Sequence, residues 1–126
     1  MNQKLFDKGM KLRRQVMGEK HIAKRSASGD DYTRRHYELV TEFAWGTIWS
    51  RPGLPLKMRS LVTLGVLAAL DRPDELEGHV NGALNNGATP DEIYEALLHA
   101  GVYCGFPAAN GAIRVAVRVF KDRQLI

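Results

Sequence analysis

One histidine lies in a setting that could support proton transfer. His79 falls within a segment of helical periodicity, and its neighbours one helical turn away are Glu75, Leu76, Gly82 and Ala83. The small residues leave room beside the imidazole for a ligand. Because histidine titrates near neutral pH, it can give or take a proton without a cofactor. Periodicity alone favours the alternative, a histidine hydrogen-bonded within a packed interface.

Two tryptophans and an arginine could form a pocket for an anion. Trp45 and Trp49 are four residues apart, so they share one face of a helix, and Arg51 follows them. The indole rings could exclude water while the guanidinium binds a carboxylate through two hydrogen bonds. By themselves, these residues fit better a core tryptophan pair beside an arginine that caps backbone carbonyls.

A glutamate and a second arginine are candidates for the same site. Glu42 precedes Trp45 by three residues and could orient His79, although most helical glutamates are simply solvated. Arg59 begins an apolar segment, and a cation at the edge of a buried surface needs an anionic partner. That partner is a protein carboxylate or a substrate anion.

The cysteine and the remaining histidines give little support for thiol or metal chemistry. Cys104 is the single cysteine, so neither an internal disulfide nor a cysteine-rich metal site is possible. We expect Cys104 near a helix C-terminus, where the dipole opposes thiol ionisation, and interpret it as a small buried filler. His99 is spaced to pair with Tyr103, whereas His21 and His36 have no supporting group. We expect no cofactor and no metal.

The elements that must position these residues are helices. The apolar residues have helical spacing almost throughout, and no segment predicts a strand. The first five predicted helices span about residues 2–17, 30–49, 55–70, 73–86 and 90–104, and a sixth follows the break at 105–107 and ends near residue 122. Gly18 ends the first helix, His21–Gly29 is interpreted as a polar connection, and Asp30 can cap the second helix. Thr89 and Glu92 form a capping box.

The composition is typical of one globular domain over residues 1–126. Apolar residues make up 44% and charged residues 25% of the chain. The longest apolar run, residues 61–70, is too short to span a bilayer, and the N-terminus does not resemble a secretory leader. We therefore expect a soluble cytoplasmic protein that does not associate with a membrane. The nearly all-apolar circumference of residues 61–70 favours burial on several sides, including against another subunit.

The net charge of +4 raises the question of nucleic-acid binding. Most of the excess lies in residues 4–35, but acidic residues interrupt this segment and no aromatic stacking pattern accompanies it. A solvated or subunit-facing surface is the better interpretation, and the charge also suits the steering of small anions. We expect no nucleic-acid partner.

Four segments together resemble the carboxymuconolactone decarboxylase family. They are WGTIWSRPGL, RSLVTLGVLAAL, HVNGALNNGAT and VYCGFPAA, in that order along the chain. The wider alkylhydroperoxidase D-like superfamily has a similar core but carries a glutamate, a CxxC motif and a histidine. Aligning His79 with that histidine places Arg72 and Glu75 at the cysteine positions and Ser60 at the glutamate position. The redox thiols are therefore missing, as the decarboxylase branch implies.

The resemblance implies an all-α, alkylhydroperoxidase D-like bundle of about six helices that forms a homo-oligomer, usually a hexamer. It also implies cofactor-independent decarboxylation of 4-carboxymuconolactone, a lactone dicarboxylate, to β-ketoadipate enol-lactone in the protocatechuate branch of the β-ketoadipate pathway. The residues that we assign to this reaction are His79, Glu42 and Arg59 for catalysis and Arg51, Trp45, Trp49 and Tyr103 for substrate binding.

Three alternatives stay open at this point. The same fold could act on a related lactone or carboxylic acid. Cys104 could support a peroxidase-like activity, although a resolving thiol is missing. A non-enzymatic, basic helical binding module would instead show nucleic-acid affinity that falls steeply with salt.

Overall fold

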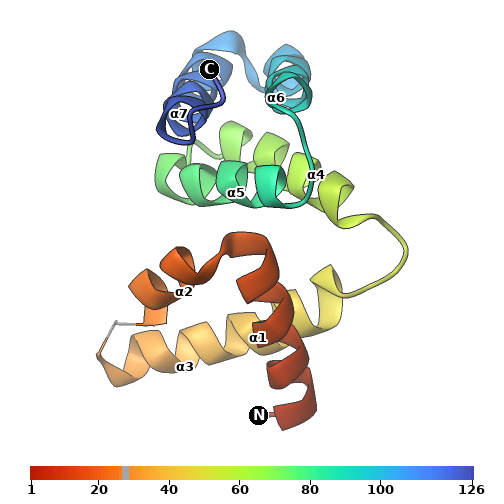
Figure 1. Cartoon of the computed structure of the whole chain (residues 1–126), viewed down its shortest axis with the longest axis vertical. Helices are drawn as coiled ribbons and strands as arrows, with labels where there is room; N and C mark the ends of the chain where they lie inside the picture. Colours follow the sequence, from red (N-terminus) through yellow and green to blue (C-terminus); the bar gives the residue numbers. More distant parts are fainter. Residues whose placement is uncertain (27–28) are drawn as a thin grey trace. The chain divides into compact units, whose positions relative to one another are not determined.

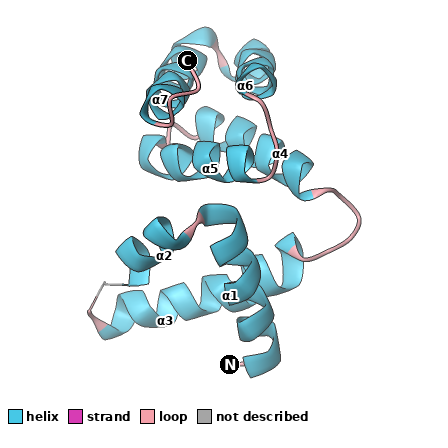
Figure 2. Cartoon of the chain, in the orientation of Figure 1, coloured by secondary structure: helices cyan, strands magenta, loops and turns pink. Residues whose placement is uncertain are grey.

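The chain is helical along almost all of its length (Figures 1 and 2). The computed structural model describes residues 1–26 and 29–126, and no strand occurs in these ranges, so the all-α prediction is confirmed. The elements are α1 (Gln3–Met17), α2 (Glu19–Ser26), α3 (Asp31–Val40), the π-helix η1 (Thr41–Trp49), α4 (Leu56–Ala69), α5 (Pro73–Asn85), α6 (Pro90–Cys104) and α7 (Phe106–Asp122).

These helices form two compact units, Met1–Pro55 and Leu56–Ile126. The expectation of a single domain stays a prediction. In the first unit, α1 packs against η1, and α3 continues directly into η1. Gly18 ends α1 as predicted, with φ at 88°, and its N–H donates to the carbonyl of Arg14. A positive φ of this size favours glycine.

The predicted connection His21–Gly29 is wrong for most of its length. Residues Glu19–Ser26 form helix α2, and positions 27 and 28 lie outside the described residues. This helix depends on tertiary packing, because the segment is strongly polar and has one buried side chain, Ile22, which is 4% exposed. A single anchoring residue gives too little periodicity to predict a helix.

The helix predicted for residues 30–49 is confirmed in extent but not in type. Asp30 caps α3 by accepting from the N–H of Thr33, as predicted. From Thr41 to Trp49, however, the backbone forms a π-helix. Such helices are rare in proteins, and those that occur are often found at functional sites. The wider register changes which side chains lie one turn apart.

In the second unit, α6 packs against α7 and α4 packs against α5. In Figure 1, α6 and α7 are viewed nearly along their axes, whereas α4 and α5 run across the picture. The core contains small and branched apolar side chains that are almost fully buried: Leu64, Leu76, Val80, Ile93, Leu97, Ala112, Ala116 and Val119. The capping box at α6 is confirmed, since Thr89 accepts from the N–H of Glu92 and Glu92 accepts from that of Thr89. No described helix is long and apolar enough to cross a membrane.

Candidate active site

Four of the seven candidate residues belong to the first unit, and two of them form a closely packed pair. The rings of Trp45 and Trp49 stack with centroids 4.6 Å apart and planes inclined by 20°. Trp45 is buried, whereas Trp49 is half-buried. The predicted common face of the two tryptophans is therefore confirmed, and the two rings form one stacked pair on η1.

Two glycines allow the backbones of α1 and η1, the helix that carries the tryptophan pair, to approach closely. A Cβ atom at Gly9 would lie 2.0 Å from the carbonyl oxygen of Thr41, and one at Gly46 would lie 2.3 Å from that of Leu5. Such distances are impossible without a backbone shift. Glycine at both positions is thus a condition for the packing of η1.

The other two candidates of the first unit, Glu42 and Arg51, make hydrogen bonds that involve backbone N–H groups. The half-buried Glu42 accepts a hydrogen bond of 2.9 Å from the backbone N–H of Asn2. Arg51 is exposed, and its backbone N–H donates to the carbonyl of Ile48. These contacts leave the proposed roles of Glu42 toward His79 and of Arg51 toward a substrate as predictions.

The second unit holds the imidazole and the second guanidinium, on neighbouring helices. Arg59 lies in the first half of α4 and His79 near the middle of α5, and α4 packs against α5. Both residues are half-buried, and Arg59 Nε and His79 Nδ1 are buried atoms. Packing therefore shields part of the Arg59 guanidinium and part of the His79 imidazole from water. A charge that is partly shielded from water interacts more strongly with an anion.

A buried polar pair beside Arg59 escaped sequence analysis. Ser60 is fully buried, and its Oγ accepts a hydrogen bond of 2.9 Å from Nδ2 of Asn86. Asn86 also donates to the carbonyl of Leu56, at 3.4 Å. These bonds join the start of α4 to the end of α5, the two helices that carry Arg59 and His79. The only signal in the sequence is a serine within an apolar run.

Tyr103 and Cys104 lie at the C-terminal end of α6. Tyr103 is 80% exposed, and its ring lies 5.5 Å from that of His99, so the predicted pairing with His99 is confirmed. Cys104 is half-buried rather than a fully buried filler, and its Sγ lies 3.8 Å from the carbonyl oxygen of Gly105. Among the described residues, no three His, Cys, Asp or Glu side chains are grouped so that they could hold a metal.

The sequence matches the carboxymuconolactone decarboxylase family over residues 34–118. The chain belongs to this family. The matched range includes all seven candidate residues and parts of both compact units. It leaves out α1 and α2, so the family match does not cover the helix that packs against η1.

Two characterised relatives match nearly the whole chain. A 4-carboxymuconolactone decarboxylase from Acinetobacter baylyi is 45% identical over 93% of this chain and 87% of its own length. A nitrosuccinic acid decarboxylase from Metarhizium robertsii is 44% identical over 97% of this chain and 85% of its own length. A third relative, an uncharacterised 15.0 kDa protein from Paracoccus denitrificans, is 34% identical over 68% of the chain and 65% of its own length. Both characterised relatives are decarboxylases.

Proposed function

We propose that this protein is a carboxy-lyase that converts 4-carboxymuconolactone to β-ketoadipate enol-lactone, in the protocatechuate branch of the β-ketoadipate pathway. The observation that carries the proposal is the 45% identity, over 93% of the chain, to a decarboxylase of that lactone. The half-buried imidazole and guanidinium of the second unit support it, because they suit proton transfer and anion binding.

The chemistry needs no cofactor because the substrate accepts its own electrons. The bond between the γ carbon and its carboxylate breaks and releases CO2. The electron pair moves through the ring alkene into the lactone carbonyl and forms a dienolate. A proton then adds to the α carbon, and the ring double bond ends in the β,γ position. The protein must therefore bind the acetate arm, stabilise the carbonyl oxyanion and supply one proton.

We assign these tasks to the candidate residues by their chemistry. His79 delivers the proton or donates a hydrogen bond to the oxyanion, and Glu42 orients it. Arg51 and Arg59 bind the acetate arm and the lactone oxygen. A guanidinium paired with the departing carboxylate would instead stabilise the ground state and slow the reaction. The aromatic side chains, Trp45, Trp49 and Tyr103, keep water from the reacting carboxylate.

Nitrosuccinate is the second candidate substrate, because the relative named for its decarboxylation is 44% identical over 97% of the chain. The two acids share one pattern: the departing carboxylate and an acetate arm are attached to the same carbon, which also carries an electron acceptor. In nitrosuccinate the electrons enter the nitro group, and the proton returns to the carbon that lost CO2. In the lactone the proton adds two carbons further along the ring. The proton donor must therefore lie in a different place for each acid.

A direct comparison of the two acids tests the proposal. Purified protein is assayed with freshly generated 4-carboxymuconolactone and with nitrosuccinate, each with and without a chelator, by CO2 release and absorbance. We expect kcat/KM at least roughly tenfold higher for the lactone, with no effect of the chelator. The reverse preference would establish the second function, and no turnover of either acid would refute both.

We also propose that the protein forms a homo-oligomer, with a hexamer as the expected size. The outer side of α4 supports association with a second copy, because Val62, Val66 and Leu70 are 60%, 52% and 63% exposed and lie four residues apart. The opposite side of the helix, with Leu64 and Ala68, is buried in the core. We further expect a cytoplasmic location, which cell fractionation would test.

A further inference from the structure

The helix that carries the tryptophan pair changes from α-helical to π-helical bonding at Thr41. The backbone N–H of Thr41 donates to the carbonyls of Tyr37 and Glu38, and its hydroxyl donates a further hydrogen bond of 2.8 Å to the carbonyl of Tyr37. A threonine hydroxyl that bonds to the preceding turn often bends a helix. Thr41 is fully buried and is the first residue of η1, so the contacts of its side chain act directly on the start of the π-helix.

The side chain that binds Thr41 from another helix is Arg13 of α1. Its Nη1 donates a hydrogen bond of 2.8 Å to Oγ1 of Thr41, and its Cζ lies 4.1 Å from the centre of the Tyr37 ring. One guanidinium therefore contacts both the last turn of α3 and the first residue of η1, because it stacks with its face and donates with its edge. Since Arg13 is the donor, the hydroxyl of Thr41 keeps its own hydrogen for the carbonyl of Tyr37.

The side of η1 that packs against α1 also carries Trp45. The buried residues of η1 are Thr41, Trp45 and Gly46, and the last two follow Thr41 by about one turn of a π-helix. A Cβ atom at Gly9 of α1 would lie 2.0 Å from the carbonyl oxygen of Thr41 and 2.7 Å from the backbone nitrogen of Gly46. Trp49 stacks on Trp45. The bond from α1 to Thr41 therefore holds the start of the face on which the tryptophan pair is built.

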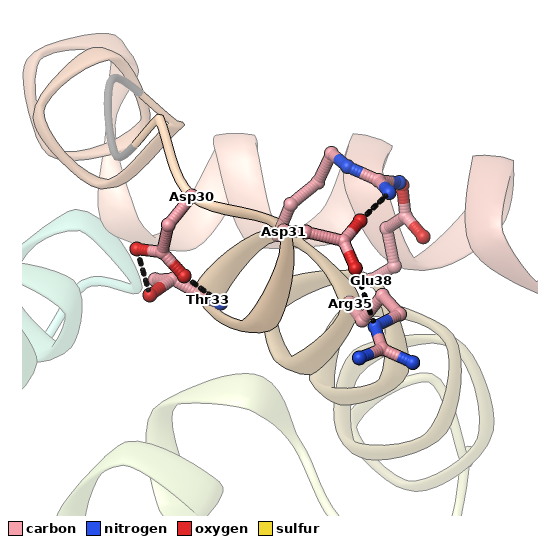
Figure 3. A network of polar contacts seen from close by, with 6 residues as sticks. Asp30, Asp31, Thr33, Arg35 and Glu38 are labelled. Carbon is pink, nitrogen blue, oxygen red and sulfur yellow. Dashed lines mark hydrogen bonds and ion pairs between the residues drawn. The ribbon is translucent and has the colours of Figure 1, made fainter.

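The α-helical part of the same helix has stabilising contacts of its own (Figure 3). Asp31 pairs with Arg35 at 3.1 Å, and Arg34 pairs with Glu38 at 3.0 Å. Both pairs join residues four apart within α3 and need no other helix. The single charged residue of η1, Glu42, instead accepts a hydrogen bond of 2.9 Å from the backbone of the N-cap residue of α1. The structure of η1 therefore depends on α1 more than that of α3 does.

We propose that Arg13 is a positioning residue for the tryptophan pair: by binding Thr41 it fixes the start of the π-helix and thereby the geometry of the stacked rings of Trp45 and Trp49. The expected effect on turnover rests on the proposed decarboxylation, in which the pair keeps water from the reacting carboxylate. The expected effect on the two rings does not. Arg13 lies in α1, outside the matched residues 34–118, so the proposal adds a helix beyond the family match to the framework of the site.

The first measurement is circular dichroism of the whole protein, because two stacked indoles give an exciton couplet. The chain has two tryptophans, so the couplet reports on this pair and is lost in Trp49→Phe. Arg13→Gln and Thr41→Val each remove the hydrogen bond between the two side chains and should weaken the couplet. The double variant should show no further loss, because both changes break the same bond. Thr41→Ser keeps the hydroxyl and should retain the couplet.

The second measurement is steady-state turnover of 4-carboxymuconolactone. Arg13→Gln and Thr41→Val should lower kcat about tenfold or more, because displaced rings let water reach the reacting carboxylate. KM should change less than about threefold, since the arginines assigned to the acetate arm are kept. A purely structural role would instead reduce the amount of folded protein and leave both the couplet and the kcat of the folded fraction unchanged.

Arg14→Gln is the matched control. It removes the same charge from the adjacent position of α1, but Arg14 is exposed and paired with Glu19, so the couplet and kcat should stay at wild-type values. If Arg13→Gln fails to fold, Arg13→Lys replaces it with the same expectations, because it keeps the charge but not the planar group.

The two measurements separate the positioning role from the proposed reaction. A couplet that weakens in Arg13→Gln and Thr41→Val but not in Arg14→Gln supports the positioning role, even if the wild type turns over neither acid and the proposed function fails. An unchanged couplet in the folded variants, or equal weakening in Arg14→Gln, would overturn the proposal.

Discussion

The imidazole of His79 is the side chain on which the proposed chemistry depends most. It is half-buried on α5, a helix whose inner face is anchored in the core by Leu76 and Val80. The packed helix fixes the backbone position from which the imidazole of His79 must reach the substrate. Gly82 and Ala83, one helical turn away in the sequence, are the local signal that singles out this histidine.

Replacing His79 by alanine should lower kcat by about 10²–10⁴ if its imidazole supplies the proton. The measurement is steady-state turnover of 4-carboxymuconolactone, with circular dichroism to check folding. His99→Ala is the matched control, because this histidine is exposed on α6 beside Tyr103. A folded His79→Ala protein with undiminished turnover would remove the residue from the mechanism.

Cys104→Ser should leave decarboxylation within about twofold of the wild type. The thiol is half-buried at the C-terminal end of α6, and the chain has no second cysteine that could act as a resolving thiol. The same turnover assay measures the effect. A large loss, accompanied by loss of peroxide reduction, would favour the thiol-dependent alternative.

At the scale of elements, the contact between α1 and η1 decides where the tryptophan pair lies. Gly9→Ala should reduce the free energy of unfolding by about 1–3 kcal/mol or more, because the new Cβ would meet the backbone of Thr41. Urea unfolding followed by tryptophan fluorescence measures it and reports on the stacked pair of Trp45 and Trp49. Gly53→Ala, which places its Cβ where no atom lies within 4 Å, should leave the stability almost unchanged. Equal stability of the two variants would contradict the close packing.

The start of α6 should show a dependence on pH. The hydrogen bond from Lys57 and that from the backbone of Thr89 lower the pKa of Glu92. Because the folded pKa is depressed, the stabilisation is present above the unfolded-state pKa and is lost as the pH falls through the folded one. Glu92→Gln should therefore be less stable than the wild type at neutral pH and equally stable near about pH 3. Urea unfolding at several pH values measures this, and a difference independent of pH would refute it.

For the whole molecule, the distribution of charge and apolar surface differs between the two compact units. The first carries the positive excess, whereas the second exposes the outer side of α4. We expect light scattering to give a mass that is a multiple of 14.1 kDa. Val66→Glu should shift it toward the monomer, because a buried carboxylate without a partner opposes association. Gln124→Glu, near the exposed C-terminus, adds the same charge and should not. A monomeric wild type would refute the proposed assembly.

The features that depend only on residues within one or two helical turns could be predicted from the sequence. The capping box of Thr89 and Glu92, the cap at Asp30 and the stop at Gly18 were all predicted, because each needs only neighbours along the chain. The pairing of Trp45 with Trp49 and of His99 with Tyr103 followed from spacing in the same way. Family membership was also readable, since it depends on the order of short segments.

Tertiary structure decided the features that depend on helices far apart in the sequence. The close approach of Gly9 to Thr41 and the bond between Ser60 and Asn86 have no local pattern. Helix α2 itself was missed because it is almost wholly polar and needs its neighbours to be stable. Spacing along one helix shows which side chains share a face. Only the packing of several helices determines what that face meets and whether a charge on it loses its water.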